Sequence, residues 1–446
     1  MGDICRICGH YHLLGVILTL ACANALMRGL SIQQTFMLTT GVWLVLPIFG
    51  ALPFVLGATE ARVVDAFFEA MSGMTTTGST VFTGLDTLPQ GILLWRGLLQ
   101  WYGGIGIIVV AMVFMPELRV GGMQIFRSEA FDTMGKILPR AAEIASRISV
   151  IYLTLTIACG LTYLALGMAP FDALVHSLTT MSTGGFSTRD ASFGAFQGPM
   201  EYAAAIFMIL ASLPFVRYVQ LLAGSAKPFY RDTQVAAYLS IILTLTVVLT
   251  VYRILANGDR FEHGLREGVF NVTSVISGTG FSSVDYQLWG PLPVVLFFFI
   301  GLIGGCAGST SCSIKIFRYQ LLFASISTQV RRLYAPHGIF EPRYNGRPVA
   351  EEVISSVMAF FVLFFVSLGI TTVLLGLTGL DFVTAISGAA TALGNIGPGL
   401  GDQIGPSGNF QNINDTAKWI LAFAMLIGRL ELMVVFVLFT TTFWRA

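Results

Sequence analysis

Long apolar segments alternate with shorter, half-apolar ones along almost the whole chain. The long segments run for roughly 20 residues, which is the length that an α-helix needs to cross a bilayer. They lie at 11–27, 33–57, 91–115, 147–169, 199–223, 235–256, 291–303 continuing into 314–335, 353–379 and 416–443. This pattern predicts an all-α polytopic membrane protein.

Each of the shorter segments is too short to span a bilayer and runs directly into a cluster of Thr, Ser and Gly. They lie at 65–77, 172–184, 267–279 and 384–396. We therefore predict four helices that enter the membrane and stop partway across it.

The short segments also repeat. Aligned as stretches of 14 residues, all four end in a glycine, at Gly78, Gly185, Gly280 and Gly397. Their first residues suit a helix N-terminus, where a side-chain oxygen can accept free N–H bonds; these are Asp65, Asp172, Glu267 and Thr384. Because a long apolar segment flanks each one on both sides, the chain predicts four tandem helix–pore-loop–helix repeats in a pseudo-fourfold arrangement around a central cation pore.

These repeats set the expected domain organisation. An N-terminal helix precedes the first repeat, and the third repeat contains an interruption rich in small residues. The expected units are 1–32 for the N-terminal helix, 33–140, 141–233, 234–345 with an intramembrane gating loop at 304–313, and 346–446.

Composition narrows the class further. Hydrophobic residues make up 55% of the chain and charged residues 11%, whereas a soluble domain has about 25% charged residues. This excludes an ordinary soluble enzyme and a disordered protein, and the continuous apolar segments argue against an outer-membrane barrel. The net charge of +1 indicates no nucleic-acid partner, and the six cysteines show no disulfide framework. No cleavable signal peptide is evident.

The positive charges predict the orientation, because Lys and Arg concentrate in cytoplasmic loops. More than half of the 25 Lys and Arg residues lie in three connections between repeats, at 116–150, 217–233 and 315–352. The half-helices therefore enter from the outside. The outer segments carry acidic residues that we expect to attract cations: Glu60, Asp65, Asp86, Asp190, Asp285, Asp381, Asp402 and Asp415.

The chemistry that these turns suggest is binding of a dehydrated cation. Irregular backbone at membrane depth is stable only when buried in protein or lining a watery path. Four such turns around one axis would form a ring of carbonyls that replaces the hydration shell of a monovalent cation. The repeat register assigns the filter, which binds K⁺ in this interpretation, to Thr76, Thr77, Gly78, Thr183, Gly184, Gly185, Gly278, Thr279, Gly280, Asn395, Ile396 and Gly397. A single Thr-Gly turn would instead indicate a kink or a close helix contact.

Two features predict a gate below this filter. Small polar residues interrupt the third inner helix, namely Gly304, Gly305, Cys306, Ala307, Gly308, Ser309 and Thr310. They indicate either a loop that crosses the pore or a small-residue packing seam. Arg429 lies inside the last apolar segment, where a charge must pair or face water. It is either a structural pair or an electrostatic barrier; Glu431, two residues away, would not face it on one helix.

At these residues the chain resembles the membrane subunits of the Trk/Ktr/HKT superfamily of potassium transporters, most closely its bacterial Trk-type uptake members. The resemblance covers about 33–446. The motifs that carry it are Thr75-Thr76-Thr77-Gly78, 182–188, Gly280-Phe281, 304–310, 395–401 and Gly428-Arg429-Leu430-Glu431. It implies a fourfold pseudosymmetric pore within one chain, a homodimer, a bacterial inner-membrane location and a cytosolic nucleotide-binding regulatory ring.

The sequence departs from the family at two places. Cys312 and Ser313 stand where the family commonly has glycines, which bears on the flexibility of the gating loop. The family usually places two helices before the first repeat, whereas this sequence offers only 11–27.

The leading functional prediction is potassium uptake driven by the membrane potential. All four filter positions are glycine, which by resemblance favours K⁺ over Na⁺; a Na⁺-permeable or ion-coupled transporter is the close alternative. A broken-helix solute transporter or an intramembrane enzyme is an alternative of a different class. A solute transporter of that kind usually has paired breaks in inverted halves, and the spans offer almost no clustered His, Asp or Glu for an enzyme. We therefore expect no enzyme activity, no cofactor and no transition metal.

Such a pore must be controlled by another protein. The cytoplasmic loops are too short for a nucleotide-binding domain, which needs roughly 100 residues or more. The expected docking surface is 116–147 with 315–352, in which four arginines are interleaved with aromatic residues typical of interfaces: Arg331, Arg332, Arg343, Arg347, Tyr334, Phe340 and Tyr344. The alternative is that these arginines bind lipid headgroups and set the topology.

Overall fold

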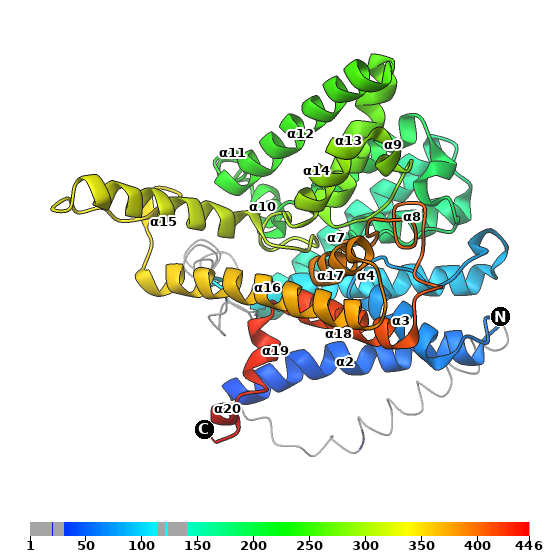
Figure 1. The fold of residues 1–446 in the computed structure, drawn as a ribbon, viewed down its shortest axis with the longest axis horizontal. Coiled ribbons are helices and arrows are strands. Elements are labelled where there is room, and N and C mark those ends of the chain that lie inside the picture. The colour runs from blue at the N-terminus through cyan, green and yellow to red at the C-terminus, as the bar shows by residue number, and fades with distance from the viewer. Residues whose placement is uncertain (1–19, 21–30, 114–120, 124–140, 446) are drawn as a thin grey trace.

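The computed structural model describes residue 20 and residues 31–113, 121–123 and 141–445. The predicted N-terminal helix at 11–27 and most of the connection at 116–140 lie outside these described residues. The described chain is predominantly helical, as Figure 1 shows. The all-α architecture expected from the apolar segments is therefore confirmed.

The first repeat begins with a capped helix. Ser31 accepts a hydrogen bond from the backbone of Gln34, whose side chain accepts one in return from Ser31 N–H, so the free N–H groups of the first turn are satisfied. The elements of this repeat are α2 (Ile32–Leu56), α3 (Val63–Met74), η1 (Leu85–Thr87) and α4 (Gln90–Val113).

The second repeat corrects one expectation. Its elements are α7 (Ala141–Ala165), α8 (Pro170–Met181), η2 (Ser192–Phe196), α9 (Pro199–Ala211) and α10 (Phe215–Leu222). The segment 199–223 was expected to be one span, but α9 and α10 are bent by 87°. Pro214 at this break has no N–H to donate to the helix. The carbonyls freed there bind a different segment, described below.

The third repeat contains the longest of the half-helices. Its elements are α11 (Lys227–Tyr230), α12 (Thr233–Asn257), α13 (Phe261–Ser277), η3 (Tyr286–Trp289), α14 (Pro291–Gly301) and α15 (Ile316–Tyr334). The repeat register predicted that Glu267 lies at the N-terminus of the third half-helix. Glu267 lies within the helix instead, because α13 begins at Phe261.

The fourth repeat follows a short antiparallel hairpin, in which Arg343 pairs with Pro348. The elements are β1 (Arg343–Tyr344), β2 (Arg347–Pro348), α16 (Glu351–Leu377), α17 (Phe382–Gly394), α18 (Asp415–Arg429), α19 (Met433–Val437) and α20 (Thr441–Arg445). The expected single span at 416–443 was wrong, because α18 ends at Arg429 and the next turn is left-handed, with φ of 64° at Glu431 and 45° at Leu432.

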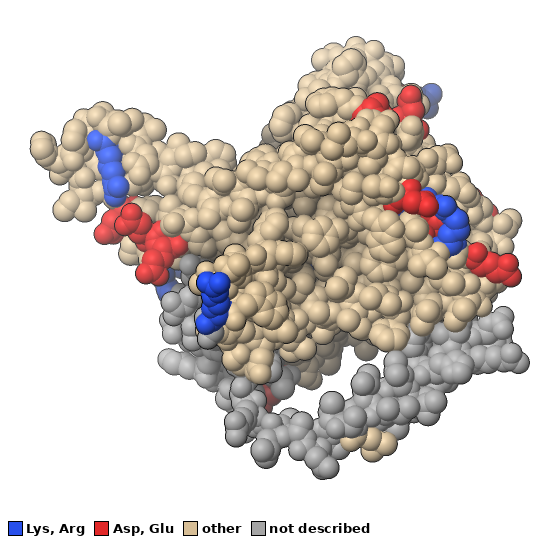
Figure 2. Space-filling model, turned by 60° about the horizontal axis from the view of Figure 1, so that its bottom comes forward, with Lys and Arg blue, Asp and Glu red and all other residues tan. Residues whose placement is uncertain are grey.

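Five of the described helices are long and apolar enough to cross a membrane, or six if the bent pair α9 and α10 forms one span. The five are α2, α4, α7, α12 and α16. Figure 2 shows that charged side chains gather at the two ends of the visible face, with a broad uncharged surface between them. This distribution fits a protein whose middle contacts lipid.

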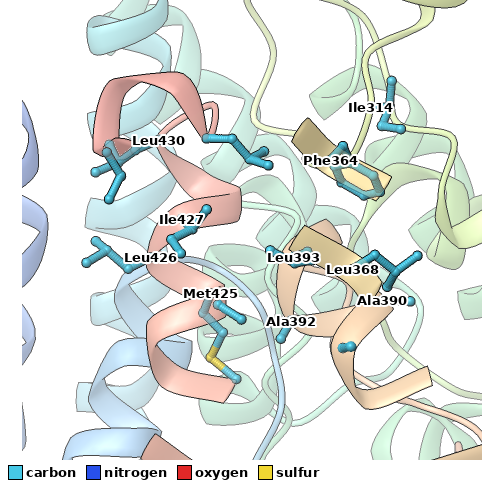
Figure 3. Close-up of a cluster of buried hydrophobic side chains, with 14 of the residues drawn as sticks. Ile314, Phe364, Leu368, Ala390, Ala392, Leu393, Met425, Leu426, Ile427 and Leu430 are labelled. Carbon is cyan, nitrogen blue, oxygen red and sulfur yellow. The ribbon is translucent and has the colours of Figure 1, made fainter. Parts of the chain in front are cut away.

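The four repeats close into a ring. In every repeat the half-helix packs against both flanking helices of its own repeat. It also packs against a helix of the preceding repeat, in the pairs α4 with α8, α9 with α13, α14 with α17, and α18 with α3. Since the last pair joins the fourth repeat to the first, the arrangement is pseudo-fourfold. Figure 3 shows part of this packing, where Leu393 of α17 lies among side chains of α16 and α18.

Candidate functional site: a ring of four glycines

The glycines that end the four aligned segments meet at one place in the fold. A Cβ placed on each would touch a carbonyl oxygen of the next repeat. The distances from that Cβ position to the oxygen would be 2.3 Å for Gly78 and Gly184 O, 1.9 Å for Gly185 and Thr279 O, 1.9 Å for Gly280 and Ile396 O and 2.9 Å for Gly397 and Thr77 O. In each case the oxygen belongs to the residue just before that repeat's own glycine. We call Gly78, Gly185, Gly280 and Gly397 the glycine ring.

The backbone around each ring glycine has the same shape in all four repeats. The ring glycines have φ of 89°, 74°, 78° and 112°. The residues two positions earlier are also left-handed, with φ of 53° at Thr76, 51° at Thr183, 74° at Gly278 and 49° at Asn395. Left-handed backbone is readily adopted by glycine and costs other residues energy, so its fourfold recurrence marks a constrained turn.

The same two hydrogen bonds hold this turn in every repeat. The residue before the ring glycine donates its N–H to the half-helix carbonyl five residues upstream, at 2.8 to 3.0 Å; the donors are Thr77, Gly184, Thr279 and Ile396. The residue before that donates to the carbonyl three residues upstream, at 3.0 to 3.3 Å. The half-helix therefore takes up these N–H groups, and its partially negative C-terminal end faces the ring.

Burial distinguishes the ring glycines from the residues before them. In each repeat the two residues preceding the glycine are buried, while the glycine itself is partly exposed. All four ring glycines line one pocket on the outer side, and this pocket has about 70 Å³ of space. The twelve residues predicted for the filter are thus brought together around this ring.

Two polar side chains behind the ring, Asn395 and Gln100, form hydrogen bonds with its turns. Asn395 donates from its amide to Thr77 Oγ1 and to Met425 O, both at 2.9 Å. Gln100 of α4 donates to Gly184 O and accepts from Phe186 N at 3.0 Å. Because a Cβ on Gly184 would lie 2.4 Å from Gln100 Cδ, a side chain at 184 would displace the Gln100 amide from these hydrogen bonds. Sequence analysis did not identify Gln100, since a polar residue in an apolar helix indicates no particular partner.

The outer mouth carries less free negative charge than expected. Arg189 donates to Asp172 at 2.7 Å and to Asp86 at 3.2 Å, and these hydrogen bonds raise the pKa of Arg189 above its ordinary value. Asp65 pairs with Lys418 at 2.6 Å and Asp381 caps α17, which lowers the pKa of Asp381 through hydrogen bonds from Thr384. Ion pairing and capping therefore neutralise or occupy several of the predicted acidic residues.

The predicted gating loop lies directly below the ring. The segment 302–315 joins α14 to α15, and the backbone at Cys312 would lie 3.4 Å from a Cβ on Gly278. Thr76 Oγ1 lies 3.7 Å from Cys312 Sγ. Cys306 and Cys312 are buried free thiols rather than a disulfide.

Neighbouring elements hold this loop by hydrogen bonds. Cys306 N–H donates to Ser212 O at 3.0 Å, and both the N–H and the hydroxyl of Thr310 donate to Ala211 O. Gly308 O accepts from Phe215 N–H at 2.9 Å, and Ala307 N–H donates to Gln234 at 2.9 Å. Three of these partners lie at the break between α9 and α10. The break that sequence analysis missed is thus the docking place of the loop.

The other polar groups of the predicted gate form hydrogen bonds within the loop itself. Gly304 N–H donates to Ile314 O at 2.9 Å and Gly305 N–H to Ser311 Oγ at 2.8 Å. Ser309 Oγ donates to Cys306 O at 2.7 Å. The segment is an irregular loop held by its own hydrogen bonds, whereas the alternative of a small-residue packing seam would need a helix here.

Arg429 is the last residue of α18 and is buried against the loop. Its guanidinium donates to Thr310 O at 3.3 Å and to Gly103 O at 3.4 Å, and it contacts Cys312 Sγ. The expectation that Arg429 lies inside a helix is corrected: the helix ends there. A small cavity of about 30 Å³, room for one or two waters, is lined by Arg429, Asn395 and loop residues.

Glu431 pairs with a residue that sequence analysis did not connect to it. The carboxylate of Glu431 binds Arg318, which is fully buried at the start of α15. Arg318 also donates to Gly121 O at 2.9 Å, and its guanidinium lies 3.8 Å from the centre of the Phe360 ring. This pair joins the helix after the loop to the turn after Arg429. No local pattern indicates it, because 113 residues separate the partners.

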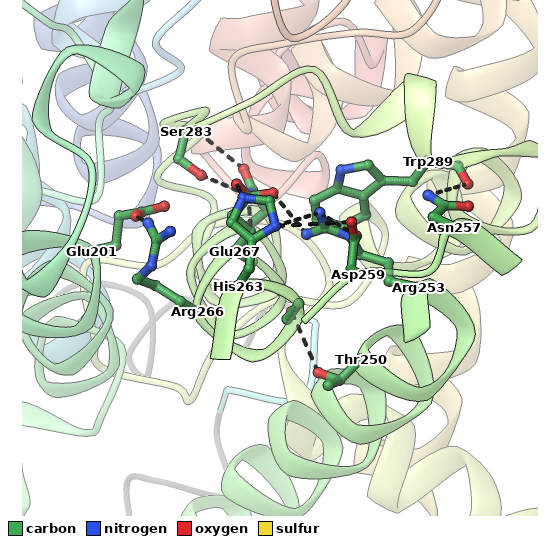
Figure 4. A network of polar contacts seen from close by, with 12 residues as sticks. Glu201, Thr250, Arg253, Asn257, Asp259, His263, Arg266, Glu267, Ser283 and Trp289 are labelled. Carbon is green, nitrogen blue, oxygen red and sulfur yellow. Dashed lines mark hydrogen bonds and ion pairs between the residues drawn. The ribbon is translucent and has the colours of Figure 1, made fainter. Parts of the chain in front are cut away.

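Other buried charges of the half-helices are paired as well. Figure 4 shows Arg253 of α12 between Glu267 and Asp259. Its ion pairs with them measure 2.7 and 2.6 Å, and its guanidinium lies 4.4 Å from the Trp289 ring centre. His263 completes this group through a 2.7 Å contact with Glu267. Within the described residues, no group of His, Cys, Asp and Glu has the geometry of a metal site.

The described part of the predicted docking surface is the end of α15 with the β1–β2 hairpin. Arg331, Arg332, Arg343 and Arg347 are exposed there, as is Tyr334. Tyr344, expected to be an anchor for a partner, is instead 6% exposed and packs in the core. Most of the other half of this surface, 116–147, lies outside the described residues.

Comparison with protein families and with known proteins finds clear similarities. The pattern of the TrkH family, described as a cation transport protein, matches residues 16–255 and 235–445. The chain is 44% identical to the Trk system potassium uptake protein TrkI of Halomonas elongata, covering 92% of this chain and 84% of that one. It is 38% identical to the Trk system potassium uptake protein TrkH of Salmonella typhimurium, covering 93% and 86%.

A solved structure has the same fold. The crystal structure of the potassium transporter TrkH from Vibrio parahaemolyticus superimposes with a TM-score of 0.85 at 33% identity. The match covers 94% of this chain and 87% of that one.

Proposed function

The chain belongs to the TrkH family of cation transport proteins of the inner membrane, and we propose that it takes up potassium ions through the glycine ring. The observation that carries this proposal is the cyclic contact of each ring glycine with a carbonyl of the next repeat. Relatives named as potassium uptake proteins support the choice of ion.

The ring suits a dehydrated monovalent cation. Backbone carbonyls compensate a cation for lost water without fixed negative charge, so the ion binds and still leaves. In this proposal the carbonyls come from Thr76, Thr183, Gly278, Asn395, the residues that follow them, and the ring glycines. The ion is the transported substrate, and the proposal needs no cofactor and no catalytic residue.

The loop 302–315 and Arg429 form the proposed gate. The loop lies on the inner side of the ring, and Arg429 places a positive charge beside it. A cation leaving the ring inward would meet both. Opening therefore requires that the loop, Arg429 or both move away.

The membrane potential is the proposed driving force. It supplies about 2.3 kcal/mol per charge for each 100 mV, enough for roughly fiftyfold accumulation of a monovalent cation. An open pore of this kind would dissipate the potential, so we propose control by a cytosolic nucleotide-binding ring that docks near Arg331 and Arg332. We also propose that the chain acts as a homodimer, with lipid covering the rest of its apolar surface.

The test is ion flux into proteoliposomes with an imposed potential, K⁺ against Na⁺. Potential-driven K⁺ uptake that exceeds Na⁺ uptake supports the proposal. Equal permeation would favour the Na⁺-permeable alternative, and flux that requires a proton or sodium gradient would favour ion coupling. Flux of neither ion, in a folded protein, would contradict a cation pore and favour a solute transporter.

A further inference from the structure

The position nine residues before each ring glycine carries a different residue in each repeat: Glu69, His176, Asn271 and Gly388. The first three are fully or almost fully buried on the half-helices. Each side chain reaches the segment that follows its own ring glycine. This recurrence rests on the repeat register and is independent of the carbonyl contacts described above.

In the first repeat the outer segment is bound by Glu69, which is one partner of a buried ion pair. Glu69 accepts from Thr80 Oγ1 at 2.9 Å and from Val81 N–H at 2.9 Å, two and three residues after Gly78. Its other partner is Arg96 of α4, at 2.7 Å. Because Arg96 neutralises it and these donors occupy its oxygens, Glu69 is a support for the segment rather than an ion ligand.

Arg96 extends this support to the next repeat. It donates to Ser187 O at 2.8 Å, and its guanidinium lies 4.2 Å from the centre of the Phe186 ring. Both residues directly follow Gly185. One buried ion pair therefore holds the outer segments of two adjacent repeats.

The second and third repeats use uncharged hydrogen bonds. His176 Nδ1 lies 2.8 Å from Asp172 O, which can only accept, so Nδ1 carries the proton and Nε2 accepts from Ser187 Oγ at 3.0 Å. Asn271 donates to Ser283 Oγ at 3.0 Å and accepts from Ser283 N–H at 3.3 Å. Ser187 and Ser283 lie two and three residues after their ring glycines.

In the fourth repeat the equivalent position is Gly388, and the neighbouring Ser387 makes the contact instead. A Cβ on Gly388 would lie 3.2 Å from Ile404 Cδ1, so the space behind the segment is already filled. Ser387, one residue earlier, accepts from Leu400 N–H at 2.9 Å, three residues after Gly397. All four repeats thus fasten the outer segment to the half-helix, each with different chemistry.

We propose that Glu69, His176, Asn271 and Ser387 are positioning residues that set the outer end of the filter and thereby its preference among monovalent cations. The proposal rests on the proposed function of the glycine ring. The outer segment begins at the ring glycine, so its distance from the half-helix determines where the glycine carbonyl lies. Ion preference depends on the number and placement of such carbonyls.

The test uses substitutions that remove the hydrogen bond while keeping the packing. His176 packs against Phe193, Phe196 and Phe281, so His176→Phe retains the aromatic cluster and loses the acceptor for Ser187. His176→Gln keeps a polar group within reach of Ser187. Leu174→Ala, on the same half-helix but 49% exposed, is the matched control.

The readout is the K⁺/Na⁺ flux ratio in proteoliposomes, with folding checked by size-exclusion chromatography. A neutral hydrogen bond changes an equilibrium by roughly two- to tenfold. We expect His176→Phe to lower the ratio by about that factor, His176→Gln to restore most of it and Leu174→Ala to leave it unchanged. Asn271→Leu should lower it likewise and serves if His176→Phe does not fold.

Three outcomes would overturn the inference. A folded His176→Phe or Asn271→Leu protein with the wild-type ratio would show that these contacts do not set ion preference. Failure of His176→Gln to rescue, or of both loss variants to fold, would assign them to the stability of the core. If the wild type conducts no K⁺, the proposed function itself fails, and the comparison of variants is not reached.

Discussion

Gly185 lies so close to Thr279 that a Cβ on it would be 1.9 Å from the Thr279 carbonyl oxygen. Its φ of 74° adds a second reason for glycine. The two residues belong to adjacent repeats, so any side chain at 185 must push one pore segment away from the next.

Gly185→Ala should therefore damage ion preference more than it damages stability. Gly167→Ala is the control, because Gly167 is also left-handed, with φ of 95°, but has nothing within 4 Å of its Cβ position. Both variants pay about 1–2 kcal/mol of backbone strain. We expect only Gly185→Ala to lower the K⁺/Na⁺ flux ratio. Equal ratios in the two folded variants would contradict the role of the ring.

Removing Arg429 should open the inner side of the pore. A cation about 10 Å from this charge is repelled by roughly 1.7 kcal/mol at an effective dielectric of 20, so Arg429→Ala should raise K⁺ flux by up to roughly twentyfold. The K⁺/Na⁺ ratio should stay unchanged, because the ring is not altered. Arg429→Lys keeps the charge but loses the planar donor set that holds Thr310 and Gly103.

The lysine variant separates the two roles of this residue. Wild-type flux in Arg429→Lys would assign the barrier to charge, and raised flux would assign it to the contacts that hold the loop. Lower flux in Arg429→Ala, with the protein folded, would favour a purely structural arginine.

Breaking the Arg318–Glu431 pair should destabilise the protein. Glu431→Gln leaves a buried guanidinium without its carboxylate, which costs about 3–5 kcal/mol of unfolding free energy. Glu352→Gln, at an exposed site on α16, is the control and should change little. The measurement is the midpoint of thermal unfolding in detergent. The double variant Arg318→Met with Glu431→Leu should recover much of the loss, and no recovery would show that the charges matter beyond this pair.

Reversing charge at the end of α15 should uncouple the regulatory partner. Arg331→Glu with Arg332→Glu is expected to abolish co-purification with a cytosolic nucleotide-binding ring, while K⁺ flux without the ring persists. Arg260→Glu, exposed before α13 on the outer side, controls for charge reversal at an exposed arginine away from the docking surface. Retained binding by the double variant would move the docking surface elsewhere and leave these arginines as topology or lipid contacts.

The loop explains why control by a partner is energetically reasonable. Five hydrogen bonds fasten it to Ser212, Ala211, Phe215 and Gln234. At about 1 kcal/mol each, they make spontaneous opening cost roughly 5 kcal/mol. A partner that binds the open form more tightly by that amount would shift the equilibrium.

Much of the architecture was determined by the sequence alone. Spans of about 20 apolar residues, short segments ending in glycine and the loops rich in Lys and Arg are local features, and membrane physics allows few ways to fold them. The register of Gly78, Gly185, Gly280 and Gly397 predicted four equivalent turns, because each position is read by counting along the chain. The four turns do meet in the structure.

Only the tertiary structure decided which side chains support these turns. Glu69 with Arg96, Arg318 with Glu431 and Gln100 with Gly184 are pairs between separate helices, and no spacing in the sequence links them. The sequence also showed no sign of the breaks at Pro214 and Arg429, because the apolar character of the chain continues across both positions. At these breaks the carbonyls of Ala211 and Ser212 and the charge of Arg429 find partners in the loop 302–315, and Glu431 finds Arg318 of α15, segments that fold beside them from far along the chain.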